Sequence, residues 1–174
     1  MLGRHVGVSN AGGRVAELTE LTDEMKAAIG TRGPTTVYEV TTQGIRTFAR
    51  AVGYRDPVFY DEDEARKRGH PALLAPPGFL GMPRFNPFAP RPEGGGRAAA
   101  FRTPFRRVLN GGTRVEPLSL VYAGDVLEAV TTLKNLELRD GRLGKMLIRT
   151  SETVYTRRSD AAVVARTTGT GISY

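Results

Sequence analysis

The sequence predicts a single α+β domain, and three observations lead to this class. Its 174 residues match the length of one domain with a substantial core. The first half carries helical periodicity around one short strand-like run, whereas four β-rich runs occupy the second half. Helices followed by an antiparallel series of strands are typical of α+β domains, and here we expect the sheet to wrap around one apolar helix.

The composition is that of a folded globular protein, with 40% hydrophobic and 25% charged residues. No apolar run reaches the length of a membrane span or of a signal peptide core, so we expect a cytoplasmic protein with no membrane partner. The absence of cysteine excludes disulfides, thiol nucleophiles and cysteine-ligated metals. Only His5 and His70 are available to zinc, so we expect neither a metal nor a cofactor.

The net charge of +7 comes from 21 arginines and 4 lysines against 18 acidic residues. The planar guanidinium group suits phosphates and carboxylates, so this composition favours an anionic ligand or partner. The basic residues are scattered along the chain rather than gathered into a stripe. We therefore expect no nucleic-acid partner.

The first elements follow a glycine-rich arm over residues 1–14, and the domain proper is expected over 15–174. Apolar residues on one helical face predict a short helix between Val15 and Ile29, which Gly30 would end. After the break at Gly33 and Pro34, the β-branched and aromatic run over 35–40 predicts a strand.

Two further helices have clear start and stop signals. Thr41 or Thr42 can cap a helix whose apolar residues follow helical spacing up to Gly53. Asp61, followed three residues later by an acidic residue, predicts another short helix that ends at Gly69.

The segment that follows is rich in proline. Pro77 suits the first turn of a helix, where a missing N–H is harmless, and we therefore expect an apolar helix to begin near it. Residues 83–97 contain four prolines and three consecutive glycines, which predicts a loop.

The second half is expected to form an antiparallel meander. Turn signals at 123–125, 140–141 and 158–160 separate β-rich runs near 105–120, 125–138, 142–157 and 161–173. With the strand at 35–40, we expect about five strands, four of them after residue 104.

Several segments in this order resemble the N-terminal, FAS1-like type of the MaoC-like dehydratase family. They are Ile-Arg-Thr-Phe-Ala-Arg-Ala-Val-Gly-Tyr-Arg-Asp-Pro-Val-Phe-Tyr-Asp from residue 45, Ala-Pro-Pro-Gly-Phe from 75, Tyr-Ala-Gly-Asp-Val from 122, Gly141 to Met146, and Ser-Glu-Thr-Val-Tyr-Thr from 151. The resemblance covers about residues 18–173. It implies a single hot-dog domain, in which an antiparallel sheet wraps around a central helix, here the one near Pro77.

The resemblance also implies a chemistry. Members of this kind hydrate 2-enoyl thioesters or dehydrate 3-hydroxyacyl thioesters of coenzyme A or acyl carrier protein. In catalytic members an Asp and a His activate the water, and backbone N–H groups at the start of the central helix hold the thioester oxygen.

The catalytic motif, Gly-Asp-any-Asn-Pro-aliphatic-His, falls on residues 53–59 but lacks both catalytic groups. Tyr54 stands at the Asp position and Phe59 at the His position. Neither side chain can act as a base at neutral pH. Asp56 occupies the Asn position, where a turn-forming role is the ordinary one, and His70 is a lone loop histidine. We therefore assign no catalytic residue, with Asp56 and His70 as weak fallbacks. Thioester hydrolysis is disfavoured because Pro77 to Met82 holds no carboxylate.

The resemblance then implies a heteromer, because the family pairs motif-less hot dogs with motif-bearing ones. This chain would be the non-catalytic subunit of an enoyl-thioester hydratase or 3-hydroxyacyl-thioester dehydratase, forming the acyl pocket while a second hot-dog subunit supplies Asp and His. One alternative is a homo-oligomeric acyl-CoA-binding protein without catalysis. The other is a homodimeric hydratase with relocated groups, for which Tyr54, Asp56 and His70 are the candidates.

Five residues are expected to bind the substrate. Backbone N–H groups of Gly78 and Phe79, at the start of the helix after Pro77, would hold the thioester oxygen. Pro77 would fix the geometry at which the chain enters the helix, and Phe59 and the ring of Phe79 would contact the acyl chain. The fifth residue is Tyr54, a possible hydrogen-bond donor.

Overall fold

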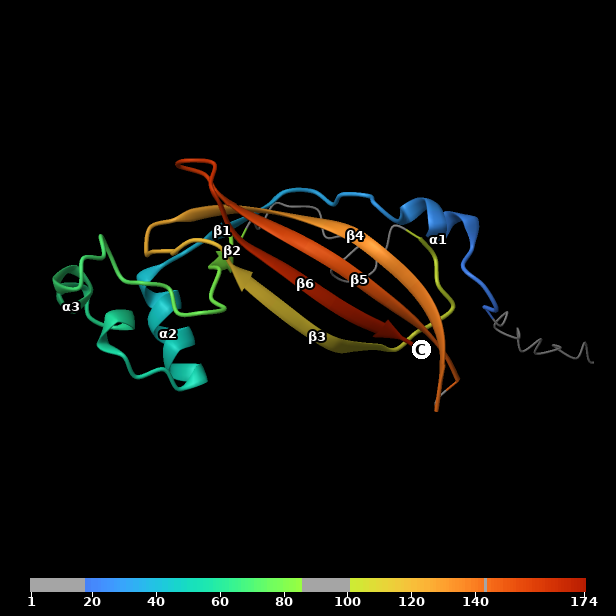
Figure 1. Cartoon of the computed structure of the whole chain (residues 1–174). Helices are drawn as coiled ribbons and strands as arrows, with labels where there is room; N and C mark the ends of the chain where they lie inside the picture. Colours follow the sequence, from blue (N-terminus) through green and yellow to red (C-terminus); the bar gives the residue numbers. More distant parts are fainter. Residues whose placement is uncertain (1–17, 86–100, 143) are drawn as a thin grey trace, which may run out of the picture.

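The structure of the chain is a computed structural model, and it describes residues 18–85, 101–142 and 144–174. The described residues form one six-stranded antiparallel sheet with short helices, in the order β2-β1-β4-β5-β6-β3 (Figure 1). The strands are β1 (Thr36–Glu39), β2 (Met82–Pro83), β3 (Val108–Pro117), β4 (Val126–Gly141), β5 (Gly144–Arg157) and β6 (Val163–Ser173). The helices are α1 (Asp23–Ala28), α2 (Thr42–Val52), the 3-10 helix η1 (Pro57–Phe59) and α3 (Glu62–Lys67).

The four long strands expected in the second half are present, but the expected meander is confirmed only for β4, β5 and β6. All four strands expected after residue 104 are present, and β4, β5 and β6 pair in sequence order. The chain then differs from a simple meander because β3 pairs with β6, at the far edge of the sheet. Figure 1 shows these strands bending along their length, with α2 and α3 at one end and α1 at the other. No helix among the described residues is long and apolar enough to cross a membrane.

The helix signals of the first half act as predicted. Thr41 caps α2, its hydroxyl accepting the N–H of Gly44, and Gly53 ends the helix with a left-handed φ of 83°. The Asp61 carboxylate caps α3 by accepting the N–H groups of Asp63 and Glu64, and these bonds lower its pKa below the ordinary value. The helix expected between Val15 and Ile29 is shorter where it is described, since α1 begins only after the Thr22 cap. The arm over 1–14 and residues 86–97 of the expected loop lie outside the described residues.

The prediction of a helix beginning near Pro77 is wrong. Pro76, Pro77, Gly78 and Phe79 form a turn closed by the Phe79 N–H, which donates to the Pro76 carbonyl at 3.0 Å. Gly78 has a φ of 88°, the conformation that glycine adopts at the third position of a type II turn and that no α-helix contains. A Pro-Pro-Gly sequence suits this turn as well as it suits a helix start. The chain then enters β2, which pairs with β1.

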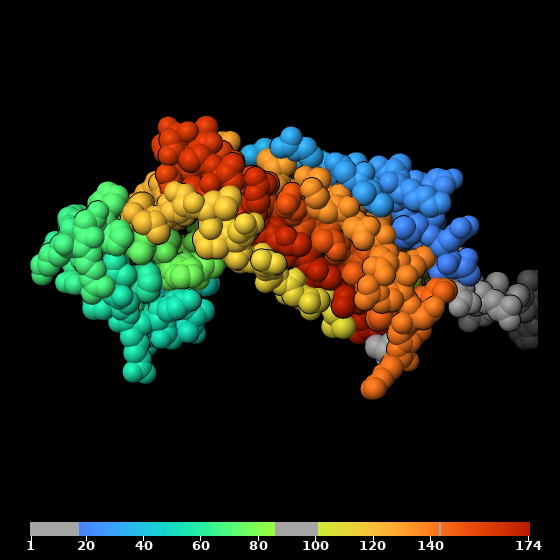
Figure 2. Space-filling model, viewed as in Figure 1, coloured from blue at the N-terminus to red at the C-terminus, as the bar shows by residue number. Residues whose placement is uncertain are grey.

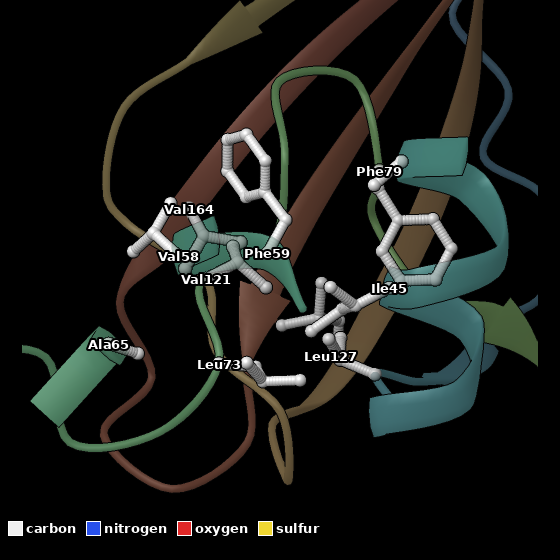
Figure 3. Packing of buried hydrophobic residues seen from close by; sticks show 11 residues of the cluster. Ile45, Val58, Phe59, Ala65, Leu73, Phe79, Val121, Leu127 and Val164 are labelled. Atoms are coloured by element: carbon white, nitrogen blue, oxygen red, sulfur yellow. The ribbon is translucent and has the colours of Figure 1, made fainter. Parts of the chain in front are cut away.

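Two apolar clusters hold the described residues together. The first packs α2 and η1 against β4, β6 and the loop segments between them, and Figure 3 shows it from close by. Its buried members are Val40, Ile45, Ala49, Val58, Phe59, Ala65, Leu73, Phe79, Val121, Leu127 and Val164. The second packs α1 against the far ends of β4 and β5 and contains Met25, Ala28, Phe101, Leu133, Leu136 and Leu147.

An arginine with a largely buried side chain joins the two loops beside the first cluster. Arg157, at the end of β5, is 15% exposed in its side chain and donates hydrogen bonds to the carboxylate of Asp160 and to the carbonyl of Leu120. Its Nε lies 3.3 Å from Asp125 Oδ2, an ion pair without hydrogen-bond geometry. Asp125 in turn accepts the N–H of Tyr122. One guanidinium group therefore ties the turn before β4 to the turn before β6.

Replacing this arginine should destabilise the fold strongly. Arg157→Met leaves the Asp125 carboxylate without its counter-charge and the Leu120 carbonyl without its donor, so we expect the free energy of unfolding to fall by about 2–4 kcal/mol. The matched control is Arg158→Met, because Arg158 pairs with Glu128 at the surface, where both side chains are more than 40% exposed. The control should cost less than about 1 kcal/mol. Urea unfolding measures both, and equal losses would contradict the role of Arg157.

Candidate functional site

The two positions that correspond to the catalytic motif lie together, directly after α2. Tyr54 follows the Gly53 cap, and Phe59 ends η1. Their rings are tilted, with centroids 5.6 Å apart. Phe59 is only 8% exposed and belongs to the first apolar cluster, whereas Tyr54 is 38% exposed. The motif positions therefore form an aromatic contact that extends from the core to the surface.

Tyr54 is held in place by contacts that the sequence did not reveal. The hydroxyl of Tyr60 donates to the Tyr54 carbonyl at 2.6 Å, and the Arg46 Nε donates to the Tyr60 carbonyl at 2.9 Å. The Tyr54 N–H also bonds to the Ala49 carbonyl of α2. The backbone at the motif is thus anchored to the helix on both sides.

Asp56 has the turn-forming role rather than a free carboxylate. Its Oδ1 accepts the N–H of Val58 and so caps η1. Arg68 Nη1 also contacts both of its oxygens, at 2.8 and 3.1 Å. The pKa of Arg68 is raised above its usual value, first by its hydrogen bond to Glu64 and then by the charge of Asp56. The Asp56 carboxylate is therefore already engaged in holding the loop.

His70 also has a partner of its own. Its Nδ1 lies 3.3 Å from the hydroxyl of Tyr122. The two rings are tilted relative to each other, and their centroids lie 5.8 Å apart. Tyr122 lies on the segment that pairs with the chain after His70, where the Ala75 N–H bonds to Val121 and the Ala123 N–H to Leu73. Within the described ranges no hydrogen bond or ion pair joins His70 to Asp56, and no group of three acidic, histidine or cysteine residues could hold a metal.

The turn over residues 76–79 changes the expected oxygen-binding site. The Phe79 N–H is used by the Pro76 carbonyl, so of the two expected donors only the Gly78 N–H is without a partner among the described residues. Pro77 and Gly78 are exposed at the tip of the turn. The expectation that a helix end presents both N–H groups is therefore wrong, because a turn consumes the second one.

Phe79 is the anchor of this turn. Its side chain is buried and its ring lies 5.3 Å from that of Phe48 on α2. The ring also covers Gly44, where an added Cβ would lie 2.8 Å from Phe79 Cζ. Figure 3 shows Phe79 and Phe59 in one cluster with Ile45 and Leu127. The structure thus brings the aromatic residues predicted to bind substrate to a single region beside α2.

Comparisons with known proteins identify a family and several relatives. Residues 27–166 match the model of the FAS1-like dehydratase domain region. A UPF0336 protein of Streptomyces coelicolor is 32% identical over 108 residues, which cover 62% of this chain and 69% of that protein. A UPF0336 protein of Thermobifida fusca is 33% identical over 103 residues, covering 58% of this chain and 63% of that protein.

Three solved structures share the fold at low sequence identity. A chain of the ChsH1–ChsH2 complex of Mycobacterium tuberculosis has a TM-score of 0.64 and 18% identity, over 86% of this chain and 90% of that one. A chain of the HadBC (3R)-hydroxyacyl-ACP dehydratase complex of the same organism gives 0.58 and 20%, over 83% and 96%. A MaoC-like dehydratase of Rhodospirillum rubrum gives 0.55 and 18%, over 84% and 92%.

These likenesses confirm the fold class predicted from the sequence. The extent of the family match, which takes in α2, the motif segment and most of the sheet, decides the family. The chain belongs to the FAS1-like dehydratase domain family and has the hot-dog fold of the MaoC-like dehydratases.

Proposed function

We propose that the chain is the non-catalytic subunit of a heteromeric enoyl-thioester hydratase or 3-hydroxyacyl-thioester dehydratase. The observation that carries the proposal is the Tyr54–Phe59 contact at the two motif positions. Adding water across a Cα=Cβ bond requires a group that takes a proton and a group that returns one. Phenylalanine has no titratable proton, and tyrosine, with a pKa near 10, is a poor base at neutral pH.

The fallback residues do not replace the missing pair. The Asp56 carboxylate caps η1 and contacts Arg68, and the His70 ring faces Tyr122. A second hot-dog subunit that carries the Asp and His would therefore supply the proton transfers. Two of the structural neighbours belong to complexes named for two different subunits, which supports such a partner.

The contribution of this chain would be a wall of the acyl pocket. Tyr54 and Phe59 offer an aromatic surface that reaches from solvent to the core, and Phe79 fixes the adjoining turn against α2. Pro77 presets the turn, and Gly78 offers a backbone N–H without a side chain to block a ligand. The substrate would be a cytoplasmic thioester of coenzyme A or of acyl carrier protein.

The first prediction from this proposal concerns the chain by itself. The purified protein should hydrate crotonyl-CoA and longer 2-enoyl-CoAs at no more than a trace rate, because it lacks the acid and base. Co-purified with a motif-bearing hot-dog subunit from the same organism, it should turn over the enoyl-CoA substrate of that enzyme. The absorbance of the enoyl thioester follows both reactions. Robust turnover by the chain alone would overturn the proposal, and thioester binding without turnover by either preparation would favour a homo-oligomeric binding protein.

The second prediction concerns the aromatic wall. In the two-subunit enzyme, Tyr54→Ala removes part of a surface that binds ground state and transition state alike. We expect KM for the enoyl-CoA to rise about threefold to tenfold, with kcat within about twofold of the wild type. Val52→Ala is the matched control, since Val52 is an exposed apolar residue two positions earlier. An unchanged KM for Tyr54→Ala, or equal effects of both variants, would remove Tyr54 from the pocket.

A further inference from the structure

The long free edge of the sheet is unusually exposed. β3 pairs with β6 on one side only (Figure 1). Nine of its ten residues are exposed. The large apolar residues Val108 (73% exposed), Leu109 (49%), Leu118 (49%) and Leu120 (52%) lie on β3 or just after it. Figure 2 shows this yellow segment along the near margin of the sheet. An exposed apolar edge strand offers unpaired backbone groups to another strand.

The same edge is strongly basic. Arg106, Arg107 and Arg114 are exposed, and no ion pair among the described residues engages them. The only acidic residue on β3 is Glu116, and in the strand register it stands directly opposite Arg166 of β6. The β3 edge therefore presents a net positive charge.

The arginines on α3 and at the other edge of the sheet are paired with acidic residues. On α3, Arg66 pairs with Glu62 and Asp63. At the opposite edge of the sheet, β2 is only two residues long, and the adjacent Arg84 pairs with Glu39. Unpaired arginines beside exposed apolar residues thus distinguish the β3 edge from the other edge of the sheet.

We propose that the β3 edge accepts an acidic edge strand of a second hot-dog subunit and rejects a second copy of this chain. This inference rests on the proposed function, and it names the surface and the charge of the partner. Antiparallel pairing of two copies through β3 would bring six arginines together with only two glutamates. Like charges facing each other across an interface suppress pairing, whereas an acidic partner strand would neutralise the edge.

The shape of the edge adds to this selectivity. The register between β3 and β6 shifts between Asn110 and Gly112, which marks a β-bulge. Gly112 has a φ of 130°, and its N–H donates to the Asn110 side chain at 3.0 Å. Bulges and charges both discourage indiscriminate strand pairing. An edge whose only role was to stay unpaired would need charge but no exposed apolar residues. The exposed side chains of Val108 and Leu109 therefore indicate that a partner covers this edge.

A charge-swapped copy of the chain can act as the acidic probe. The swapped variant carries Arg106→Glu, Arg107→Glu and Arg114→Glu, and a neutral variant carries glutamine at the same positions. The control carries Arg32→Glu, Arg50→Glu and Arg142→Glu, three exposed sites away from β3 and from the motif segment, with the same change in net charge. Circular dichroism and thermal unfolding establish that each variant is folded, and analytical ultracentrifugation measures association.

At low salt, wild type and swapped variant should associate at least about tenfold more tightly than wild type with itself or with the control. High salt should reduce this difference, because exposed charges are screened. The neutral variant, which lacks the repulsion, should self-associate more tightly than the wild type. Wild-type self-association as tight as its pairing with the swapped variant would overturn the inference. The inference would also be overturned if the wild type associated neither with itself nor with the swapped variant.

A second assay separates this inference from the proposed function. With the motif-bearing subunit present, the swapped variant should require at least about tenfold more protein for half-maximal hydration than the wild type or the control. If the swapped variant supported hydration at the same protein concentration as the wild type, the edge inference would be overturned and the proposed function would stand. Pairing of wild type with swapped variant, without hydration by any mixture, would overturn the proposed function and leave the edge inference intact.

Discussion

The apolar cluster between α2 and the ends of β4 and β6 is the constraint on which the rest of the site depends. Phe59 and Phe79 reach this cluster from separate segments and seat η1 and the turn at Gly78 beside the same helix. Because Phe59 is part of the core, a histidine at its position would place an imidazole among apolar side chains. The departure from the catalytic motif and the packing of the core are thus one feature of the molecule, since Phe59 stands at the His position of the motif and also holds the loop in place.

Local signals in the sequence predicted much of the fold, because the interactions behind them lie within a few residues. Thr41 and Asp61 cap helices through N–H groups two or three positions away, and Gly53 ends α2 through its own backbone conformation. The segment at Pro77 was mispredicted because its local signals suit a turn and a helix equally. In the structure, Gly78 has the left-handed conformation of the turn, and long-range contacts accompany it: Phe79 packs on Phe48, and β2 pairs with β1.

The candidate site was predictable in part for the same reason. The motif alignment selects Tyr54 and Phe59, five residues apart, and in the structure the chain between them folds around η1 so that their rings are in contact. The contacts of the fallback residues join distant positions, with Arg68 twelve residues from Asp56 and Tyr122 fifty-two residues from His70. No local pattern encodes such pairs. The pairing of β3 with β6, which creates the basic edge, is likewise a property of the whole sheet.

The central claim is that every proton transfer belongs to a partner subunit, and substitution on both sides of the two-subunit enzyme tests it most directly. Steady-state hydration should fall to the background rate when the Asp or His of the partner subunit's motif is replaced by alanine. The same enzyme built with Asp56→Asn or His70→Gln in this chain should keep its pH–rate profile and its kcat within about twofold. Residual hydration in the first case that disappears with Asp56→Asn or His70→Gln would contradict the account.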